Sequence, residues 1–273
     1  MSAAVEFYLL RAAGPEPLGS RPPGAGIYTG MRTFEHDRFL WLDAHLERLE
    51  SNIATLGWDF ELDRDVVRRG LHAVVTAYAG KDARVRLDVL AAGAADERLV
   101  CQLTPFEPVP AAFIEQGVGL ALTRDLSRVR PRVKSTEFID QRKPYPLQGQ
   151  ECFEHVMVAP DGRLLEGTSS NFFGVEAGVL RTSGEDVLEG ITRKVFLFLA
   201  ERAGLAVDLR AVHATELSAL DEAFITSSSR GLVPARSIEG RPVGDECPGP
   251  VARRLLADYA QLVVSSARPA VDV

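Results

Sequence analysis

The chain has 273 residues, enough for one large domain or two modest ones, and its 46% hydrophobic and 25% charged residues are ordinary for a globular protein. A formal net charge of −7 argues against a nucleic-acid binder, which normally carries a basic surplus. The three cysteines have no C-x-x-C spacing, which argues against a metal site or a disulfide framework and fits a reducing compartment. The first eleven residues place a glutamate inside their only apolar stretch. We therefore expect no signal peptide, no membrane association and a cytoplasmic location.

Hydrophobic periodicity divides the first hundred residues into short strands and two helices. The pattern predicts, in chain order, a first strand, a loop over 14–26, two strands within 28–41 around a turn at 35–37, a helix over 44–56 that Asp43 caps, and a helix over 63–79. Alternation then predicts strands over 83–90 and 98–105, with Arg84, Arg86 and Asp88 on the face opposite the apolar residues.

The second part of the chain is richer in predicted strands. They lie near 117–123, 154–159, 171–175, 179–182 and 222–226, and helices are expected near 191–203, 215–219 and 250–265. A proline-bounded crossing at 105–110 separates the two parts. We therefore predict an α+β chain with a small domain over 1–115 and a larger, strand-rich domain over 116–273.

Three segments carry side chains suited to anion binding or acid–base chemistry. The predicted helix after Gly190 begins with Ile191-Thr192, and free N–H groups at a helix start favour a phosphate. The serine-rich turn 226–231 follows a strand and presents hydroxyls, while Glu166-Gly167 interrupts an otherwise continuous strand. Taken singly, the first two segments are better explained as an ordinary capped helix and a solvated loop, and a surface turn explains the third equally well.

In their order along the chain, the motifs resemble the class IV aminotransferases, which include branched-chain and D-amino-acid aminotransferases and aminodeoxychorismate lyase. The strongest match is Leu165-Glu-Gly-Thr-Ser-Ser-Asn-Phe-Phe173, which fits the family pattern E-G-x-x-x-N-x-F. Further matches at consistent spacing are His45-Leu-Glu-Arg-Leu49, Val133-Lys-Ser135, Val179-Leu-Arg-Thr182, Leu188-Glu-Gly-Ile-Thr-Arg193, Asp221-Glu-Ala-Phe-Ile-Thr226 and Val243-Gly-Asp-Glu-Cys-Pro-Gly-Pro250. The resemblance runs from about Gly26 to Gly249. It implies a two-domain fold like that of D-amino-acid aminotransferase, with a small α/β sandwich followed by a pseudo-barrel.

The resemblance also assigns a pyridoxal 5′-phosphate (PLP) site. It implies that Lys134 is the Schiff-base lysine and that Glu166, 32 residues later, faces the ring nitrogen. The remaining cofactor contacts that it implies are Arg48, Ile191, Thr192 and Ser228 at the phosphate and Leu188 against the ring. Lys143 and Lys194 are weaker candidates for the reactive lysine, because the first precedes a proline in a loop and the second begins a helix beside the phosphate site.

The substrate side departs from the family patterns. Tyr28 matches a pocket tyrosine, whereas Thr29 stands where a glutamate often follows, a feature shared with the lyase branch. The Arg-x-His pair of the D-amino-acid enzymes is missing, so Arg86, or less favourably Arg84, is the candidate for a carboxylate; a solvated strand face is the alternative. Arg230, beside Ser229, either binds a carboxylate or points outward. Prolines at 144 and 146 are expected to break the helix that usually follows the lysine.

These features favour PLP-dependent transamination between a small amino acid or amine and a 2-oxo acid. An aminodeoxychorismate-type lyase is the first alternative, on the strength of Thr29 and the missing Arg-x-His pair. A cofactor-free member of the fold is the second, on the strength of the proline-broken segment. The resemblance implies a homodimer.

Overall fold

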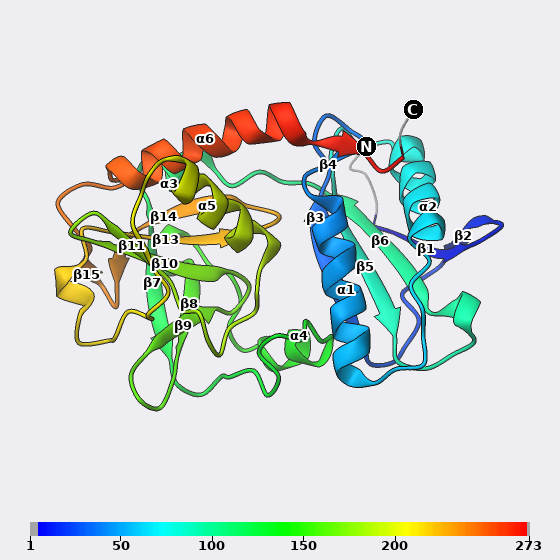
Figure 1. The fold of residues 1–273 in the computed structure, drawn as a ribbon, viewed down its shortest axis with the longest axis horizontal. Coiled ribbons are helices and arrows are strands. Elements are labelled where there is room, and N and C mark those ends of the chain that lie inside the picture. The colour runs from blue at the N-terminus through cyan, green and yellow to red at the C-terminus, as the bar shows by residue number, and fades with distance from the viewer. Residues whose placement is uncertain (1–4, 272–273) are drawn as a thin grey trace. The chain divides into compact units, whose positions relative to one another are not determined.

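The computed structural model describes residues 5–271, and the chain forms two compact units (Figure 1). Unit 1 consists of residues 1–107, 133–139 and 262–273, and unit 2 of residues 108–132 and 140–261. The division differs from the predicted domains 1–115 and 116–273, because two later segments, one containing Lys134, return to unit 1. No helix in the described range 5–271 is long and apolar enough to cross a membrane.

Unit 1 is built on a five-stranded antiparallel sheet with the order β2-β1-β6-β5-β3. The strands are β1 (Glu6–Arg11), β2 (Gly14–Leu18), β3 (Gly26–Arg32), β5 (Ala83–Leu90) and β6 (Leu99–Pro105). The predicted loop over 14–26 is wrong at its start, because residues 14–18 pair with β1 as an edge strand. Two prolines at 15 and 17 are tolerated there, since an edge strand need not donate every N–H to a ladder.

Two helices cover one face of this sheet, α1 (Leu42–Leu56) and α2 (Arg64–Ala77). Asp63 caps α2 by accepting from the N–H groups of Asp65 and Val66, as the predicted start at 63 requires. The predicted cap at Asp43 is wrong, because Trp41 precedes α1 in a left-handed conformation and Asp43 lies within the first turn, where its charge suits the helix dipole.

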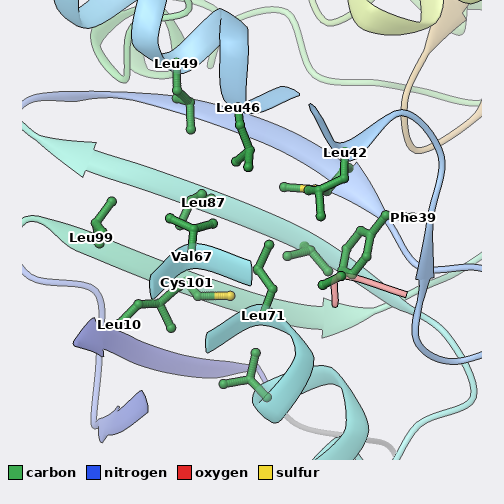
Figure 2. Packing of buried hydrophobic residues seen from close by; sticks show 14 of the residues in the cluster. Leu10, Phe39, Leu42, Leu46, Leu49, Val67, Leu71, Leu87, Leu99 and Cys101 are labelled. Carbon is green, nitrogen blue, oxygen red and sulfur yellow. The ribbon is translucent and has the colours of Figure 1, made fainter. Parts of the chain in front are cut away.

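The core of unit 1 lies between the helices and the sheet (Figure 2). Leu46 and Leu49 of α1, Val67 of α2, and Leu87 and Leu103 of the sheet are completely buried in it. Their helical and alternating spacing is the one the sequence predicted. Short strands β4 (Arg38–Phe39) and β16 (Arg268–Pro269) pair beside it, and the 3₁₀ turn η1 (Ala95–Glu97) joins β5 to β6.

Unit 2 is a strand-rich barrel. Its main strands are β7 (Val118–Thr123), β8 (Glu154–Val158), β9 (Leu164–Gly167), β10 (Asn171–Glu176), β13 (Glu222–Ser227) and β14 (Gly231–Ile238). Neighbours pair in the order β10-β13-β14-β7-β8-β9, and β9 also pairs with β10, so that these strands close on themselves. The strands β11 (Val179–Arg181), β12 (Val207–Asp208) and β15 (Arg241–Pro242) extend the sheet. This closure confirms the pseudo-barrel that the resemblance implied.

The longest helix contained in unit 2 is α5 (Ile191–Arg202), which buries Ile191, Val195, Phe196 and Leu199. The remaining helices are α3 (Ala111–Glu115), α4 (Glu137–Gln141), α6 (Pro250–Ser266) and the 3₁₀ turns η2 (Gln150–Cys152) and η3 (Leu217–Ala219). The helix α4 after Lys134 has only five residues, as the prolines predicted. The expected helix at 215–219 is only the 3₁₀ turn η3.

Candidate active site

The candidate residues fall into two groups, one in each unit. Unit 1 carries Tyr28, Thr29, Arg48, Arg86 and Lys134; unit 2 carries Glu166, Leu188, Ile191, Thr192, Ser228, Ser229 and Arg230.

Glu166 is a buried carboxylate at the end of β9, with 2% of its side chain exposed. Its Oε1 accepts from Arg128 Nε at 2.7 Å and from the Leu188 N–H at 3.2 Å, and its Oε2 accepts from Asn171 Nδ2 at 3.2 Å. The Arg128 side chain is only 5% exposed. A buried carboxylate needs such charged and polar partners, and together they favour its ionised form.

The start of α5 offers a set of hydrogen-bond donors. Gly190 precedes the helix in an extended conformation and supplies no side-chain cap to its first N–H groups. Thr192, buried in the first turn, donates from its hydroxyl to Ser228 Oγ at 3.1 Å, so the helix start and the turn after β13 meet. Uncapped N–H groups together with two hydroxyls form a donor cluster suited to an anion. Ser229, the next residue of the turn, is partly exposed.

Asn171 connects the carboxylate to this helix start. Its amide donates both to Glu166 Oε2 and to the Leu188 carbonyl at 2.8 Å. A Cβ at Gly190 would lie 2.1 Å from Asn171 Oδ1, so only glycine fits between this side chain and α5. The spacing between Glu166 and the helix start is therefore held by side-chain contacts as well as by the sheet.

Arg230 is engaged with protein groups. Its guanidinium, 9% exposed, lies 3.1 Å from the carboxylate of the fully buried Glu154. It also donates to Ser227 Oγ at 2.9 Å and to Ser169 Oγ at 2.9 Å. This arrangement ties the turn after β13 to the turn between β9 and β10. The predicted substrate contact of Arg230 stays a prediction, while its outward orientation is wrong because the guanidinium is buried.

In unit 1, Lys134 is held along the free edge of β3. Its carbonyl accepts from the Tyr28 N–H at 2.9 Å, and its N–H donates to Asn52 Oδ1 on α1 at 3.0 Å. The neighbouring Ser135 bridges to Ile27. The ammonium lies 4.8 Å from the centroid of the Tyr28 ring, within range of a cation–π interaction. The backbone of Lys134 is thus fixed on both sides, and its side chain meets the predicted pocket tyrosine.

Thr29 alternates with Tyr28 and points to the opposite face, beneath α1, where it is completely buried. Its hydroxyl oxygen accepts from Arg48 Nη2 at 2.8 Å and lies 2.7 Å from His45 Nδ1. Burial first, and then the charges of Arg48 and Lys134, hold the pKa of His45 well below its usual 6.5. The neutral His45 can form only one hydrogen bond with Thr29 through Nδ1, and the Thr29 hydroxyl joins His45 to Arg48.

Arg86 lies on the opposite face of the sheet from Thr29. Its guanidinium carbon is 4.5 Å from the centroid of the Tyr28 ring, and it donates to the carboxylate of Asp88 at 2.6 and 3.0 Å. Its side chain is 24% exposed, so the simple solvated-face alternative does not describe it.

Several residues near the candidates had no predicted role. Arg128 begins the basic run that ends at Lys134, yet only the fold shows that it reaches Glu166. His45 and Asn171 stand inside the matched motifs, and Asp88 follows the alternation of its strand. The sequence signal that could have identified His45 and Asn171 was their place inside a matched motif. For Asp88 it was an acidic residue on an otherwise basic strand face.

Comparison with known proteins identifies the class and then the family. The branched-chain amino acid aminotransferase from Thermobaculum terrenum, solved in its PLP form, has the same fold, with a TM-score of 0.80 over 99% of both chains at 21% identity. D-alanine aminotransferase from Bacillus licheniformis is 29% identical over 89% of each chain. Aminodeoxychorismate lyase from Bacillus subtilis is 28% identical over 79% of this chain and 78% of its own. Residues 26–238 match the family described as amino-transferase class IV, and the chain belongs to this family of PLP-dependent enzymes.

Proposed function

We propose that the protein is a PLP-dependent transaminase that moves an amino group between a small amino acid or amine and a 2-oxo acid. The observation that carries the proposal is the link in unit 2 between the buried Glu166 carboxylate and the donor-rich start of α5 through Asn171. A carboxylate suits a protonated ring nitrogen, and uncapped N–H groups with hydroxyls suit a phosphate ester. These are the two ends of PLP, so the donor set fits the cofactor that family members bind.

In this proposal the residues of unit 2 bind and orient the cofactor. Glu166 holds the ring nitrogen protonated, Leu188 contacts the ring, and Ile191, Thr192 and Ser228 bind the phosphate. When bound, PLP withdraws electrons from the substrate Cα and so weakens its C–H bond. The Arg128 guanidinium, 2.7 Å from the Glu166 carboxylate, would favour the charged form of that carboxylate beside the ring nitrogen.

The residues of unit 1 supply the amine and a further cation. Lys134 would hold the cofactor and would move the proton at the substrate Cα. Arg48 contributes to phosphate binding, with Thr29 and His45 fixing its guanidinium. The predicted substrate contacts are Tyr28 and Arg86 in unit 1 and, separately, Ser229 and Arg230 in unit 2. The proposed assembly is a homodimer, for which light scattering provides the test.

The first experiment follows cofactor and amino group separately. Purified protein saturated with PLP is expected to show the visible band of lysine-bound cofactor, and Lys134→Ala is expected to lose it; Lys143→Ala is the matched control, since Lys143 is exposed and pairs with Asp140. Borohydride reduction followed by peptide mapping should place the label on Lys134. A panel of amino donors should then convert the band to that of the pyridoxamine form, and 2-oxo acids should restore it. No bound PLP at saturation, which the cofactor-free alternative expects, would contradict the proposal.

One observation favours the lyase alternative and another opposes it. Thr29 matches the lyase branch, and the lyase from Bacillus subtilis is among the relatives. However, the Thr29 hydroxyl is completely buried, accepts from Arg48 and lies 2.7 Å from His45 Nδ1, so it is engaged with protein groups. We therefore place transamination first. Pyruvate release from an aminodeoxychorismate-type substrate without any 2-oxo acid would reverse this order.

A further inference from the structure

A charged cluster lies on the face of the five-stranded sheet that α1 and α2 leave uncovered within unit 1. Tyr28 of β3 is paired directly with Asp88 of β5, and Gly30 is paired with Arg86. Residues paired in this way share a face, and the next residues, Thr29 and Leu87, point toward the helices. Because Gly30 has no side chain, the Arg86 side chain has room to turn toward Tyr28.

Asp88 is the centre of this cluster. Its side chain is completely buried, and it accepts from Arg86 Nη2 at 2.6 Å and from Arg86 Nε at 3.0 Å. Arg21, from the loop between β2 and β3, contributes a longer contact of 3.5 Å from its Nε. The rest of the Arg21 guanidinium donates to the carbonyls of Pro22 and Gly24, which holds it in place. Two guanidinium groups and one carboxylate leave the cluster with a single positive charge.

The cluster is close to the reactive lysine. The Arg86 guanidinium carbon lies 4.5 Å and the Lys134 ammonium 4.8 Å from the centroid of the same Tyr28 ring, so the two cations are separated by no more than about 9 Å. An amino or oxo acid whose Cα is at the lysine can therefore reach Arg86 with a carboxylate, because the hydrogen bond between the carboxylate and the guanidinium covers part of that span.

We propose that Arg86, Arg21 and Asp88 form a subsite for one substrate carboxylate, and that Asp88 makes the enzyme prefer 2-oxo acids with one carboxylate over those with two. The inference rests on the proposed transaminase function and names its substrate class. One net positive charge matches one carboxylate. A second carboxylate at this cluster would approach the buried negative charge of Asp88 after the one net positive charge of the cluster has been balanced, and like charges in a partly desolvated site repel strongly. Asp88 is thus a specificity-determining residue, and Arg86 is the group that binds the anion.

The test compares variants with opposite effects on the cluster charge. Asp88→Asn keeps the shape and one hydrogen-bond acceptor for Arg86 but removes the negative charge. Arg21→Gln removes one positive charge. Arg69→Gln, on an exposed position of α2, is the matched control for loss of an arginine in unit 1. The ratio of kcat/KM for pyruvate to that for 2-oxoglutarate is measured in the half-reaction of the pyridoxamine form. Calorimetry gives the dissociation constants of propionate and glutarate, which have no reacting carbonyl.

We expect wild-type protein to favour pyruvate and propionate. Asp88→Asn should shift both ratios toward the dicarboxylate by roughly tenfold, Arg21→Gln should shift them the other way, and Arg86→Gln should weaken all four ligands. Unchanged ratios in both Asp88→Asn and Arg21→Gln, or an equal shift in Arg69→Gln, would overturn the inference. If Asp88→Asn does not fold, the Arg21→Gln result decides. Failure of the proposed function can be told apart from failure of this inference. The first would appear as absent PLP or absent amino transfer in the wild-type protein, whereas the dissociation constants of propionate and glutarate would still be measured.

Discussion

At the scale of single residues, the buried ion pair between Arg128 and Glu166 requires that both partners be present. Both side chains are nearly inaccessible, and the Arg128 Nε lies 2.7 Å from the Glu166 carboxylate. Removing one partner of a buried pair leaves the other charge with one counter-ion fewer, which typically costs about 3–5 kcal/mol, whereas replacing both costs much less. Each residue of the pair is therefore expected to support the stability of the fold mainly by balancing the charge of the other.

We predict that Arg128→Met and Glu166→Gln each lower the free energy of unfolding by about 3 kcal/mol and that the double variant loses clearly less than the sum. Urea unfolding of the four proteins measures this double-mutant cycle. Arg132→Gln is the control from the same basic run, because its side chain is 73% exposed. Additive losses would show that the two residues act independently.

His45 makes stability depend on pH in a defined direction. Its pKa is held well below 6.5 in the folded protein by burial and by the charges of Arg48 and Lys134. Between these two values the unfolded chain binds a proton that the folded protein does not, so stability is complete above pH 6.5 and decreases as the pH falls, by up to about 1.4 kcal/mol per unit.

We expect the urea concentration at the unfolding midpoint of the wild-type protein to decrease when the pH is lowered from 7.5 to 5.5. The decrease should be smaller in His45→Gln. The glutamine side chain still offers an acceptor to Thr29 but cannot take up the proton. His72→Gln on α2 makes the same substitution at another histidine of unit 1 and serves as the comparison. An unchanged pH dependence in His45→Gln would assign the effect to other groups.

For single residues, the sequence predicted the positions of the candidate residues but not the side chains that they contact. The positions of Lys134 and Glu166 followed from the resemblance, because motif spacing survives when other residues change. The partners of Glu166 and Arg230 did not follow. Arg128 is 38 positions from Glu166 in the sequence, and Glu154 is 76 positions (230 − 154) from Arg230. Such pairs depend on how strands are ordered in the barrel, which periodicity does not encode.

Among the elements, the start of α5 is the one most closely constrained by its neighbours. Gly190 approaches Asn171 so closely that a Cβ would lie 2.1 Å from its amide oxygen. Asn171 in turn donates to Glu166 and to the Leu188 carbonyl. A side chain at 190 must therefore displace either the helix start or the amide that orients the carboxylate.

We predict that Gly190→Ala weakens PLP binding at least about tenfold, with a smaller effect on pyridoxal, which lacks the phosphate that the helix start is proposed to bind. Equilibrium dialysis or absorbance titration with both cofactors gives the comparison. Gly149→Ala is the control in unit 2, because a Cβ there meets nothing within 4 Å. Equal weakening for PLP and pyridoxal would place the effect at Glu166 instead of the phosphate.

The elements also show which local signals are sufficient. The amphipathic spacing of α1, α2 and α5 and the alternation of β5 predicted these elements to within a few residues. The strand β14 was not predicted, β9 was read only as part of a strand that Glu166-Gly167 interrupts, and β2 was taken for a loop. Their residues include Gly167, Pro234 and Pro15, which are poor strand formers when read locally. They are strands because neighbouring strands pair with them, which is a tertiary effect.

For the whole molecule, the chain segments that complete unit 1 come from three parts of the sequence. The C-terminal segment pairs through β16 with β4, and Arg68 of α2 donates to the Ala270 carbonyl at 2.8 Å. Ala270 itself is completely buried in the core of unit 1. Sequence alone divided the chain once, near residue 115, because hydrophobic patterns identify elements but not the distant segments that they contact.

We predict that this last segment is required for the stability of unit 1. Ala270→Asp would place a carboxylate in an apolar core, where no arrangement of the surrounding leucines and valines replaces its hydration. The expected loss is about 3 kcal/mol or more, which lowers the unfolding temperature by roughly 10 °C. Val264→Asp is the matched control, because it makes the same kind of change at a side chain that is 74% exposed, six residues earlier. Calorimetry of both variants, combined with hydrogen exchange, tests the assignment: protection should fall first in β5 and β6 of unit 1 and persist in β13 and β14 of unit 2. Equal melting of the two variants, or a loss of protection confined to unit 2, would show that residues 262–273 do not belong to the core of unit 1.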